Sequence, residues 1–513
     1  MALPALLTLI TALTALSGYL RESSLAAAFG AGLHTDAYFI AAAIPMVAGD
    51  LLVGSVLTAS IVPVFAPLMR DGAPQAIEVR RAVSGIYYLV AGTSVMIAGV
   101  LIAAMPGLVA VLSPGFGKDA HDFTVGLGRD LAWLLPLNSL VLLSSLLLNA
   151  ARGYLVPASA WLVINLAFVA IVYGAYPVLG VNVLVWGPLL GPFLMVLLLF
   201  RELAARGMRP GLAPMFAAPP VRHALRLARP ILLSGGIGSG LGILMISHLL
   251  LRSFGSTFGE GAVSALGYAF RLYEVPVSLM TATAGTLVFT ELSRLSQGSG
   301  REQSADRCRQ LLAWGVIILV PTVCATAVFA DVIVRLLFER GAFSGRATEL
   351  TVRALQGFSP AILFESILMV GLRVLYALRR PGMAVWIGVA TIGTLFGAAT
   401  IAASTHSVAT LAGALSASFG VAAALSVATI GRSVGRAILP GWREGLAVLV
   451  VAGGAATAVD LAKQWTPAPS LATDFALLLA YAALYAAGIA VLCPARRVEL
   501  MTLVRAMAHK LHG

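Results

Sequence analysis

The chain has 513 residues, of which 59% are hydrophobic and only 11% are charged, with a formal net charge of +12. A water-soluble protein carries charge on about a quarter of its residues to keep its surface hydrated. The composition therefore excludes a soluble enzyme, a secreted disulfide scaffold and a disordered chain, and it indicates an integral membrane protein.

Fourteen apolar stretches follow one another along the chain, and each is long enough to cross a bilayer as a helix, which takes about 20 mostly apolar residues. The stretches cover residues 3–29, 35–68, 82–112, 123–152, 157–178, 182–205, 224–253, 262–294, 308–338, 347–378, 382–404, 408–431, 442–463 and 472–494. Several contain prolines, which membrane helices tolerate where protein or a wet cavity satisfies the freed backbone groups. The sequence therefore predicts an all-α polytopic membrane protein of about 14 transmembrane helices with an internal cavity.

The basic residues are distributed unevenly between the segments that join these stretches. With a cytoplasmic N-terminus, the segments after even-numbered stretches and the C-terminal tail hold most of the arginines, including Arg80, Arg206 and Arg380, and the other side holds few. This asymmetry obeys the positive-inside rule. We therefore expect both termini in the cytoplasm and no nucleic-acid partner, because the positive charge sets the topology.

The two halves of the chain repeat weakly. Phe29-Gly30 closes the first stretch and Phe254-Gly255 closes the seventh, and Pro136 in the fourth corresponds to Pro360 in the tenth. Six crossings per copy leave both copies in the same orientation, which predicts two six-helix lobes in parallel repeat with a cavity between them. The predicted boundaries are an N-terminal lobe at 1–206, a linker at 207–222, a C-terminal lobe at 223–436, two extra C-terminal helices at 437–495 and an amphipathic cytoplasmic tail at 496–513.

Charged residues inside the stretches are the candidate functional residues. A charge at mid-bilayer costs about 2.5–3.5 kcal/mol and is retained beside a cavity or a partner. Arg271 offers a planar fork of donors that suits phosphate, and the first and eighth helices belong to opposite lobes, so Arg21 and Arg271 could converge on one anion. The expected substrate-binding cavity residues are Arg21, Asp36, Arg271 and Glu274, and weaker candidates are Glu22, Asp50, Glu365 and Arg373.

Each of these residues also has a purely structural interpretation. Arg21 could pair with Asp36 or Asp50, and Asp36 could cap its own helix. Arg271 and Glu274 are three residues apart, so they share a helix face and could neutralise each other. The sequence has no P-loop, no HExxH and no cluster of histidines and cysteines, so no catalytic residue, metal ligand or cofactor is expected.

Four stretches carry a family resemblance: Phe29 to Tyr38 (FGAGLHTDAY), Tyr268 to Pro276 (YAFRLYEVP), Leu337 to Phe343 (LFERGAF) and Tyr376 to Pro381 (YALRRP). They resemble the MurJ (MviN) family of lipid II flippases, in the multidrug/oligosaccharidyl-lipid/polysaccharide exporter superfamily. The resemblance implies two six-helix lobes around a V-shaped cavity, with two extra helices that form a lipid-side groove.

The same resemblance places Arg21, Asp36 and Arg271 on charged cavity positions of the family, whereas Ala15 and Gly49 stand roughly where the family has two further arginines. The family's sodium site draws on acidic and amide side chains in the seventh and eleventh helices. The corresponding stretches here contain none, which agrees with the expectation of no metal.

The implied activity is the movement of a polyprenyl-pyrophosphate-linked saccharide, lipid II or a related lipid-linked oligosaccharide, across the bacterial inner membrane by alternating access, for peptidoglycan or cell-envelope polysaccharide synthesis. The expected partners are this substrate and membrane lipids, with cell-envelope synthesis enzymes as further candidates, and the chain is expected to act as a monomer. Two alternatives stay open: a cation-coupled exporter of small molecules, and a non-transporting membrane partner of cell-envelope synthesis.

Overall fold

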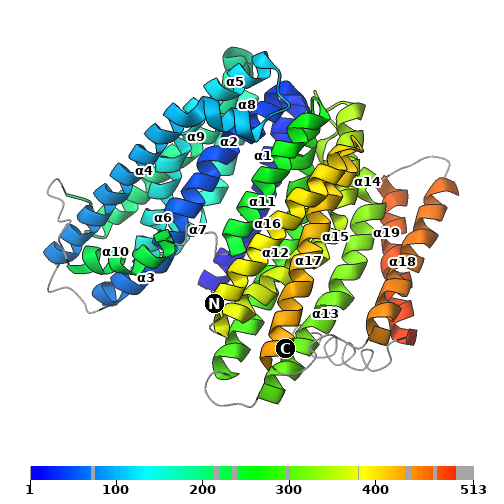
Figure 1. The fold of residues 1–513 in the computed structure, drawn as a ribbon. Coiled ribbons are helices and arrows are strands. Elements are labelled where there is room, and N and C mark those ends of the chain that lie inside the picture. The colour runs from blue at the N-terminus through cyan, green and yellow to red at the C-terminus, as the bar shows by residue number, and fades with distance from the viewer. Residues whose placement is uncertain are drawn as a thin grey trace. The chain divides into compact units, whose positions relative to one another are not determined.

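The computed structural model describes residues 2–70, 76–211, 219–233, 240–295, 301–378, 380–434, 442–465 and 471–492. Over these ranges the chain is helical between short turns and contains no strand (Figure 1). The long helices are α1 (Ala2–Phe29), α2 (Leu33–Gly49), α3 (Ser55–Arg70), α4 (Ala76–Leu112), α5 (Lys118–Leu131), α6 (Leu134–Ala150), α8 (Ala160–Leu179), α9 (Val183–Ala205), α10 (Pro219–Leu233), α11 (Gly240–Gly255), α12 (Ala262–Leu295), α13 (Arg301–Val328), α15 (Gly345–Ala377), α16 (Pro381–Ala403), α17 (Val408–Val434), α18 (Trp442–Trp465) and α19 (Leu471–Leu492). The shorter elements are η1 (Asp50–Gly54), α7 (Leu155–Ala158), η2 (Gly180–Asn182), η3 (Ser256–Phe258) and α14 (Ala330–Phe338).

The helices reproduce the fourteen predicted crossings. Nine segments of the described chain are long and apolar enough to span a membrane, or ten with the bent pair α13 and α14. One of these segments, Ala160–Ala205, contains two helices, α8 and α9, that are joined at η2. Counting these two separately and adding α1, α11 and α12 gives fourteen, which is consistent with the predicted number of about 14. The prediction of an all-α polytopic membrane protein is confirmed.

Several crossings are broken where the sequence carries prolines or glycines. The second crossing contains a π-helical turn, η1, between α2 and α3, with Gly49 before it and Gly54 at its end. The fourth is divided into α5 and α6, and Pro136 lies in the first turn of α6, where a proline costs no backbone hydrogen bond. Such breaks are stable inside a bilayer only where protein or water satisfies the freed backbone groups.

The ninth crossing bends by 68° between α13 and α14, and a lysine from another helix holds the bend. The Lys463 ammonium group of α18 donates to the Val328 carbonyl oxygen at 2.9 Å and to the Asp331 carboxylate at 2.8 Å. It also lies 4.9 Å from the centre of the Phe329 ring. A cation suits the carbonyl end of α13 because of the helix dipole, so α18 helps to fix the angle of the break.

The seventh predicted stretch, 224–253, differs from the structure. Its first ten residues belong to α10, whose Val221 and Ala224 are buried in a core cluster with side chains of α3, α4, α6 and α9. The rest forms α11, and residues 234–239 lie outside the described part. Arginines at intervals of three and four give α10 an amphipathic pattern, which explains why it packs along one face and does not extend α11 as a uniformly apolar span.

Small residues let neighbouring helices approach closely. A Cβ atom on Gly191 of α9 would lie 2.8 Å from the backbone of Ile164 on α8, and one on Gly357 of α15 would overlap the Ala409 carbonyl oxygen on α17. Lipid tails are as apolar as leucine, so helices in a bilayer are held together mainly by such close packing. Gly191 and Gly357 therefore serve helix association.

The chain packs into two compact units. The first comprises Met1–Gly267 and Leu337–Thr348, and the second comprises Tyr268–Leu336 and Glu349–Gly513. This division passes through α12 and does not test the lobe boundaries expected at 206, 222 and 436, which stay predictions. The predicted tail at 496–513 and residues 212–218 of the predicted linker lie outside the described residues.

Candidate functional site

Arg21, on α1, is held in the first unit by two aromatic side chains. Its Nη2 atom donates a hydrogen bond to the Tyr38 hydroxyl at 3.0 Å, and its guanidinium carbon lies 4.8 Å from the centre of the Phe168 ring. The expected alternative, an ion pair with Asp36 or Asp50, is wrong for the described residues: Arg21 bonds neither. A stacked guanidinium is fixed in orientation while several of its donors stay available for a ligand.

Asp36 caps a helix far away in the sequence. Its carboxylate, 2% exposed, accepts hydrogen bonds from the backbone N–H groups of Gly261 at 2.6 Å and Ser264 at 2.7 Å, and from the Ser264 hydroxyl. These two N–H groups belong to the first turn of α12, where the unpaired donors and the helix dipole favour a negative charge. Its own helix is capped instead by Thr35, whose hydroxyl accepts from the Gly32 N–H at 3.0 Å.

The capping is reciprocal. The Glu260 carboxylate, which precedes α12, accepts from the Leu33 N–H at the start of α2 at 3.0 Å. The Ser264 hydroxyl oxygen also lies 2.8 Å from the Thr35 hydroxyl oxygen. Each of two helices, from different sequence repeats, thus supplies the acceptor for the other's N-terminus. We call these four residues, Thr35, Asp36, Glu260 and Ser264, the cap lock.

Two further contacts join the repeats beside the cap lock, and each involves a motif noted in the sequence. The Ala342 N–H, in the LFERGAF stretch, donates to the Ala27 carbonyl oxygen at 2.8 Å. The Gly115 N–H, after the third crossing, donates to the Ser256 hydroxyl at 3.1 Å. Both contacts bring the turn that ends one crossing onto the end of a crossing in the other repeat. All of these residues belong to the first unit.

Replacing Gly30 by alanine is expected to destabilise this region. Gly30 has φ +66°, and a Cβ atom there would overlap the Ala342 carbonyl oxygen. The left-handed backbone alone costs an L-residue about 1–2 kcal/mol, and the clash adds to this cost. Thermal unfolding in detergent should show a lower midpoint for Gly30→Ala, whereas Gly92→Ala, on an open face of α4 with nothing within 4 Å, should not. Equal midpoints for the two variants would contradict the close packing of this turn.

The second unit contains the other two main candidates, Arg271 and Glu274. They form the ion pair that their spacing predicted, with Nη1 and Oε2 3.1 Å apart and with side chains 38% and 45% exposed. Arg271 also lies 6.0 Å from the centre of the neighbouring Phe270 ring. The convergence of Arg21 and Arg271 on one anion stays a prediction.

The weaker candidates have varied surroundings. Glu365 is 5% exposed and accepts a hydrogen bond from the Tyr273 hydroxyl at 3.0 Å. Arg373 is exposed and donates to the Thr281 carbonyl oxygen at 2.7 Å. Glu22 is buried beside Arg21, and Asp50 is exposed at the start of the π-helical turn. Their role in substrate binding stays a prediction.

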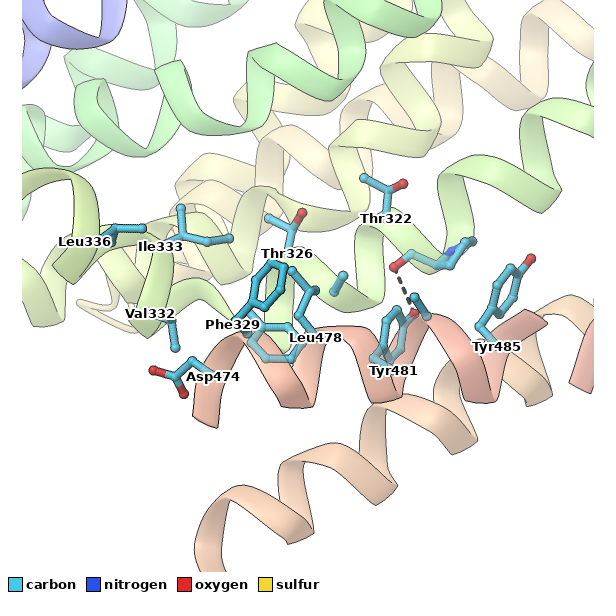
Figure 2. Close-up of a pocket in the computed structure, with 14 residues that line it drawn as sticks. Thr322, Thr326, Phe329, Val332, Ile333, Leu336, Asp474, Leu478, Tyr481 and Tyr485 are labelled. Carbon is cyan, nitrogen blue, oxygen red and sulfur yellow. Dashed lines mark hydrogen bonds between the residues drawn. The ribbon is translucent and has the colours of Figure 1, made fainter. Parts of the chain in front are cut away.

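An apolar groove lies between α13, α14 and α19 in the second unit (Figure 2). Its volume is about 550 Å³, and the Tyr481 hydroxyl on its wall donates to the Pro321 carbonyl oxygen at 2.9 Å. The side chains that Figure 2 labels around it, among them Phe329, Ile333 and Leu478, are largely apolar. In the described part of the chain no group of three or more histidine, cysteine, aspartate or glutamate side chains could hold a metal ion.

Sequence reasoning missed the partners of the candidates. Tyr38 and Phe168, which hold Arg21, are aromatic residues in apolar stretches and carry no distinguishing pattern. Glu260 and Ser264 had a usable signal: the separation of Phe29-Gly30 from Phe254-Gly255 is 225 residues, the same as that of Asp36 from Gly261. Aligning the repeats at this offset brings the start of α2 to within four residues of the start of α12.

A helical membrane fold with repeated crossings, broken helices and charges retained inside the spans defines a polytopic transporter. Residues 25–480 match the model of the family described as lipid II flippase MurJ. The chain belongs to this family, and so to the transporters and not to the enzymes.

Individual proteins agree with this assignment. The chain is 29% identical over 342 residues to a probable lipid II flippase MurJ of Rhizobium tropici, a match covering 65% of this chain and 62% of that protein. It is 27% identical over 397 residues to a probable lipid II flippase MurJ of Rhizobium meliloti, covering 74% and 72%. The first match thus spans less than two thirds of the relative's length. In fold, the chain is similar to a solved lipid II flippase MurJ in an inward closed conformation, with a TM-score of 0.77, 16% identity, and coverage of 95% and 98%.

Proposed function

We propose that this protein moves lipid II, or a related polyprenyl-pyrophosphate-linked saccharide, from the inner to the outer leaflet of the bacterial inner membrane by alternating access. The family match over residues 25–480 carries this proposal, and the names of the relatives supply the substrate. The proposal includes both termini in the cytoplasm and a monomeric transporter.

The chemistry of the headgroup explains why arginines are needed. A diphosphate cannot enter hydrocarbon alone, because an unpaired buried charge is prohibitively costly. Guanidinium groups replace its hydration with charge-assisted hydrogen bonds of matching geometry. Arg21, held by Tyr38 and Phe168, supplies one such group, and Arg271 supplies the second in this proposal.

The cap lock offers a closure for the outer end of the pathway. The positive-inside rule assigns the starts of α2 and α12 to the extracytoplasmic side, and there the repeats exchange hydrogen bonds through Asp36 and Glu260. When the two helix starts separate, the same carboxylates and N–H groups become exposed to water, and water can replace each lost hydrogen bond. Because the exchange is nearly balanced, the closure is reversible, as alternating access requires.

The polyprenyl tail does not need to cross polar surface. The groove between α13, α14 and α19 is lined mainly by apolar side chains. Such a lining suits an isoprenoid chain that stays on the lipid side while its headgroup passes through the cavity. The tail then needs only van der Waals contact, and the headgroup carries the selectivity.

Complementation tests the function directly. A bacterial strain depleted of its own lipid II flippase should resume growth when it expresses this chain, and proteoliposomes with the purified protein should transfer lipid II headgroups between leaflets. If the protein reaches normal levels in the membrane but neither restores growth nor transfers lipid II headgroups, the proposal is refuted.

Replacing Arg21 by lysine should cause a partial loss of translocation, about tenfold. Lysine keeps the charge, but it loses the planar fork and the stacking on Phe168, and a hydrogen bond to a charged group is worth about 1.5–3 kcal/mol. The assay is headgroup transfer in proteoliposomes at matched protein density. Full activity would show that Arg21 acts only as a charge or does not meet the substrate.

A further inference from the structure

Glu365 is an acidic side chain buried in a membrane helix without a cation. It is 5% exposed, and in the described part of the chain its one hydrogen bond is the one donated by the Tyr273 hydroxyl. Tyr273 is itself fully buried between Phe270 and Phe358, whose ring centres lie 5.2 and 5.1 Å away. A carboxylate with one neutral donor in such surroundings is costly, and protonation removes the charge.

On the described residues of the two helices that form this pair, three arginines are engaged elsewhere, and a fourth, Arg346, is exposed in the first turn of α15. On α12, Arg271 pairs with Glu274. On α15 itself, Arg353 pairs with Glu349, and Arg373 donates to the Thr281 carbonyl oxygen.

The other helices packed on α15 bring no cation to Glu365 either. On α17, Gly420 packs beside Phe364, and Arg432 lies twelve residues further along, about 18 Å away. On α13, the Cys324 thiol faces Tyr481, and Arg309 is exposed near the other end of the helix. Among the described residues, no ion pair includes Glu365, and the groups that act on its carboxyl are the Tyr273 hydroxyl and the Glu274 carboxylate.

The position of this acid relates it to a candidate substrate ligand. The bonds from Tyr273 to Glu365 and from Arg373 to Thr281 both join residues 92 apart, so α12 and α15 run parallel over this part of their lengths. Glu365 is thus level with Arg271 and Glu274. Glu274 is close enough to act electrostatically on Glu365, and Arg271 neutralises Glu274 only while the two are paired.

We propose that Glu365 is a proton-binding site linked to binding of the diphosphate headgroup at Arg271. A diphosphate that engages Arg271 adds negative charge beside α12 and withdraws the cation from Glu274. Both changes disfavour a carboxylate at Glu365, so its carboxyl oxygen keeps or takes up one proton from water as the anion binds. By linkage, protonation of Glu365 strengthens headgroup binding by the same factor. This inference rests on the proposed function.

The first experiment needs no substrate. Infrared difference spectra of the full-length protein and Glu365→Gln at neutral pH should show one protonated carboxyl band that the variant lacks. Glutamine has the shape of the protonated acid and accepts the Tyr273 bond, so the variant is expected to fold, which thermal unfolding verifies. A carboxylate band in place of the acid band would overturn the proposal.

The second experiment measures linkage, with lipid II in nanodiscs as the probe. Its diphosphate is a diester, so its charge is constant across the neutral range. The unmodified protein should bind lipid II about tenfold more weakly in mildly alkaline than in mildly acidic buffer, a change equal to one pKa unit of linkage. In Glu365→Gln this dependence should disappear, whereas Glu349→Gln, an exposed acid on the same helix, should keep it.

The outcomes separate the two proposals. Equal affinity at both pH values in the unmodified protein, or an unchanged pH dependence in Glu365→Gln, overturns the linkage and leaves the flippase proposal standing. An absence of lipid II binding at either pH overturns the proposed function and the linkage with it.

Discussion

Arg271→Ala is expected to abolish lipid II headgroup translocation while the protein stays folded and inserted. The ion pair of Arg271 with Glu274 is about 40% exposed, and exposed pairs contribute only about 0.2–1 kcal/mol to stability. In the translocation pathway the same guanidinium has a larger effect, because each hydrogen bond to a charged group is worth about 1.5–3 kcal/mol. Loss of two such bonds to a diphosphate lowers binding by more than a hundredfold. Headgroup transfer in proteoliposomes measures the effect.

A matched control comes from the same unit. Arg353 forms an intrahelical ion pair with Glu349 on α15, and both side chains are more than half exposed. Arg353→Ala therefore removes an equivalent pair without removing a proposed substrate ligand, and it should retain transfer. Arg271→Lys should fall between the two, because it keeps the charge and loses the fork. Equal transfer by Arg271→Ala and Arg353→Ala would exclude Arg271 as a substrate ligand.

The number and order of the crossings could be predicted because each depends on local composition. An apolar run of about 20 residues has few alternatives to a membrane helix. The seventh stretch was harder, since a hydropathy window does not distinguish a buried amphipathic helix such as α10 from the start of a span. The spacing of its arginines carried that information.

The charged residues of the candidate site could be predicted from the sequence, but the residues that contact them could not. The Arg271–Glu274 pair follows from a three-residue spacing and is confirmed. The structural alternative for Arg21 was an ion pair with an aspartate, but Arg21 stacks on Phe168 and bonds Tyr38. Such contacts join residues 17 to 147 positions apart, and no local pattern specifies them. Asp36 was singled out as a charged residue within an apolar stretch, and its acceptor role depends on a helix that starts more than 200 residues later.

Asp36→Ala is expected to cause the largest loss of stability among the candidate residues. Its carboxylate serves two backbone N–H groups and a hydroxyl that are buried with it. Each buried donor that loses its acceptor costs about 1–3 kcal/mol, and water cannot enter to replace the carboxylate. The midpoint of thermal unfolding should therefore fall strongly. Asp36→Asn, which keeps one acceptor oxygen, should fall less, and Glu260→Ala should change little, because Glu260 is exposed and water can bond the Leu33 N–H in its place.

A second readout separates closure of the outer end from substrate binding. Ala37, fully buried next to Asp36, can be replaced by cysteine in a background without the native cysteines and exposed to a water-soluble thiol reagent. If the cap lock closes the outer end, Asp36→Asn should raise the labelling rate several-fold in the absence of substrate. An amide oxygen bonds the N–H groups of α12 less strongly than the carboxylate does, so the nearly balanced equilibrium shifts towards the open state. If Asp36 acts only as a substrate ligand, labelling without substrate stays unchanged and lipid II affinity alone falls. A role of Asp36 in closure requires faster labelling without substrate. A residue that stabilises the closed conformation changes the populations of the closed and open conformations even when no ligand is present.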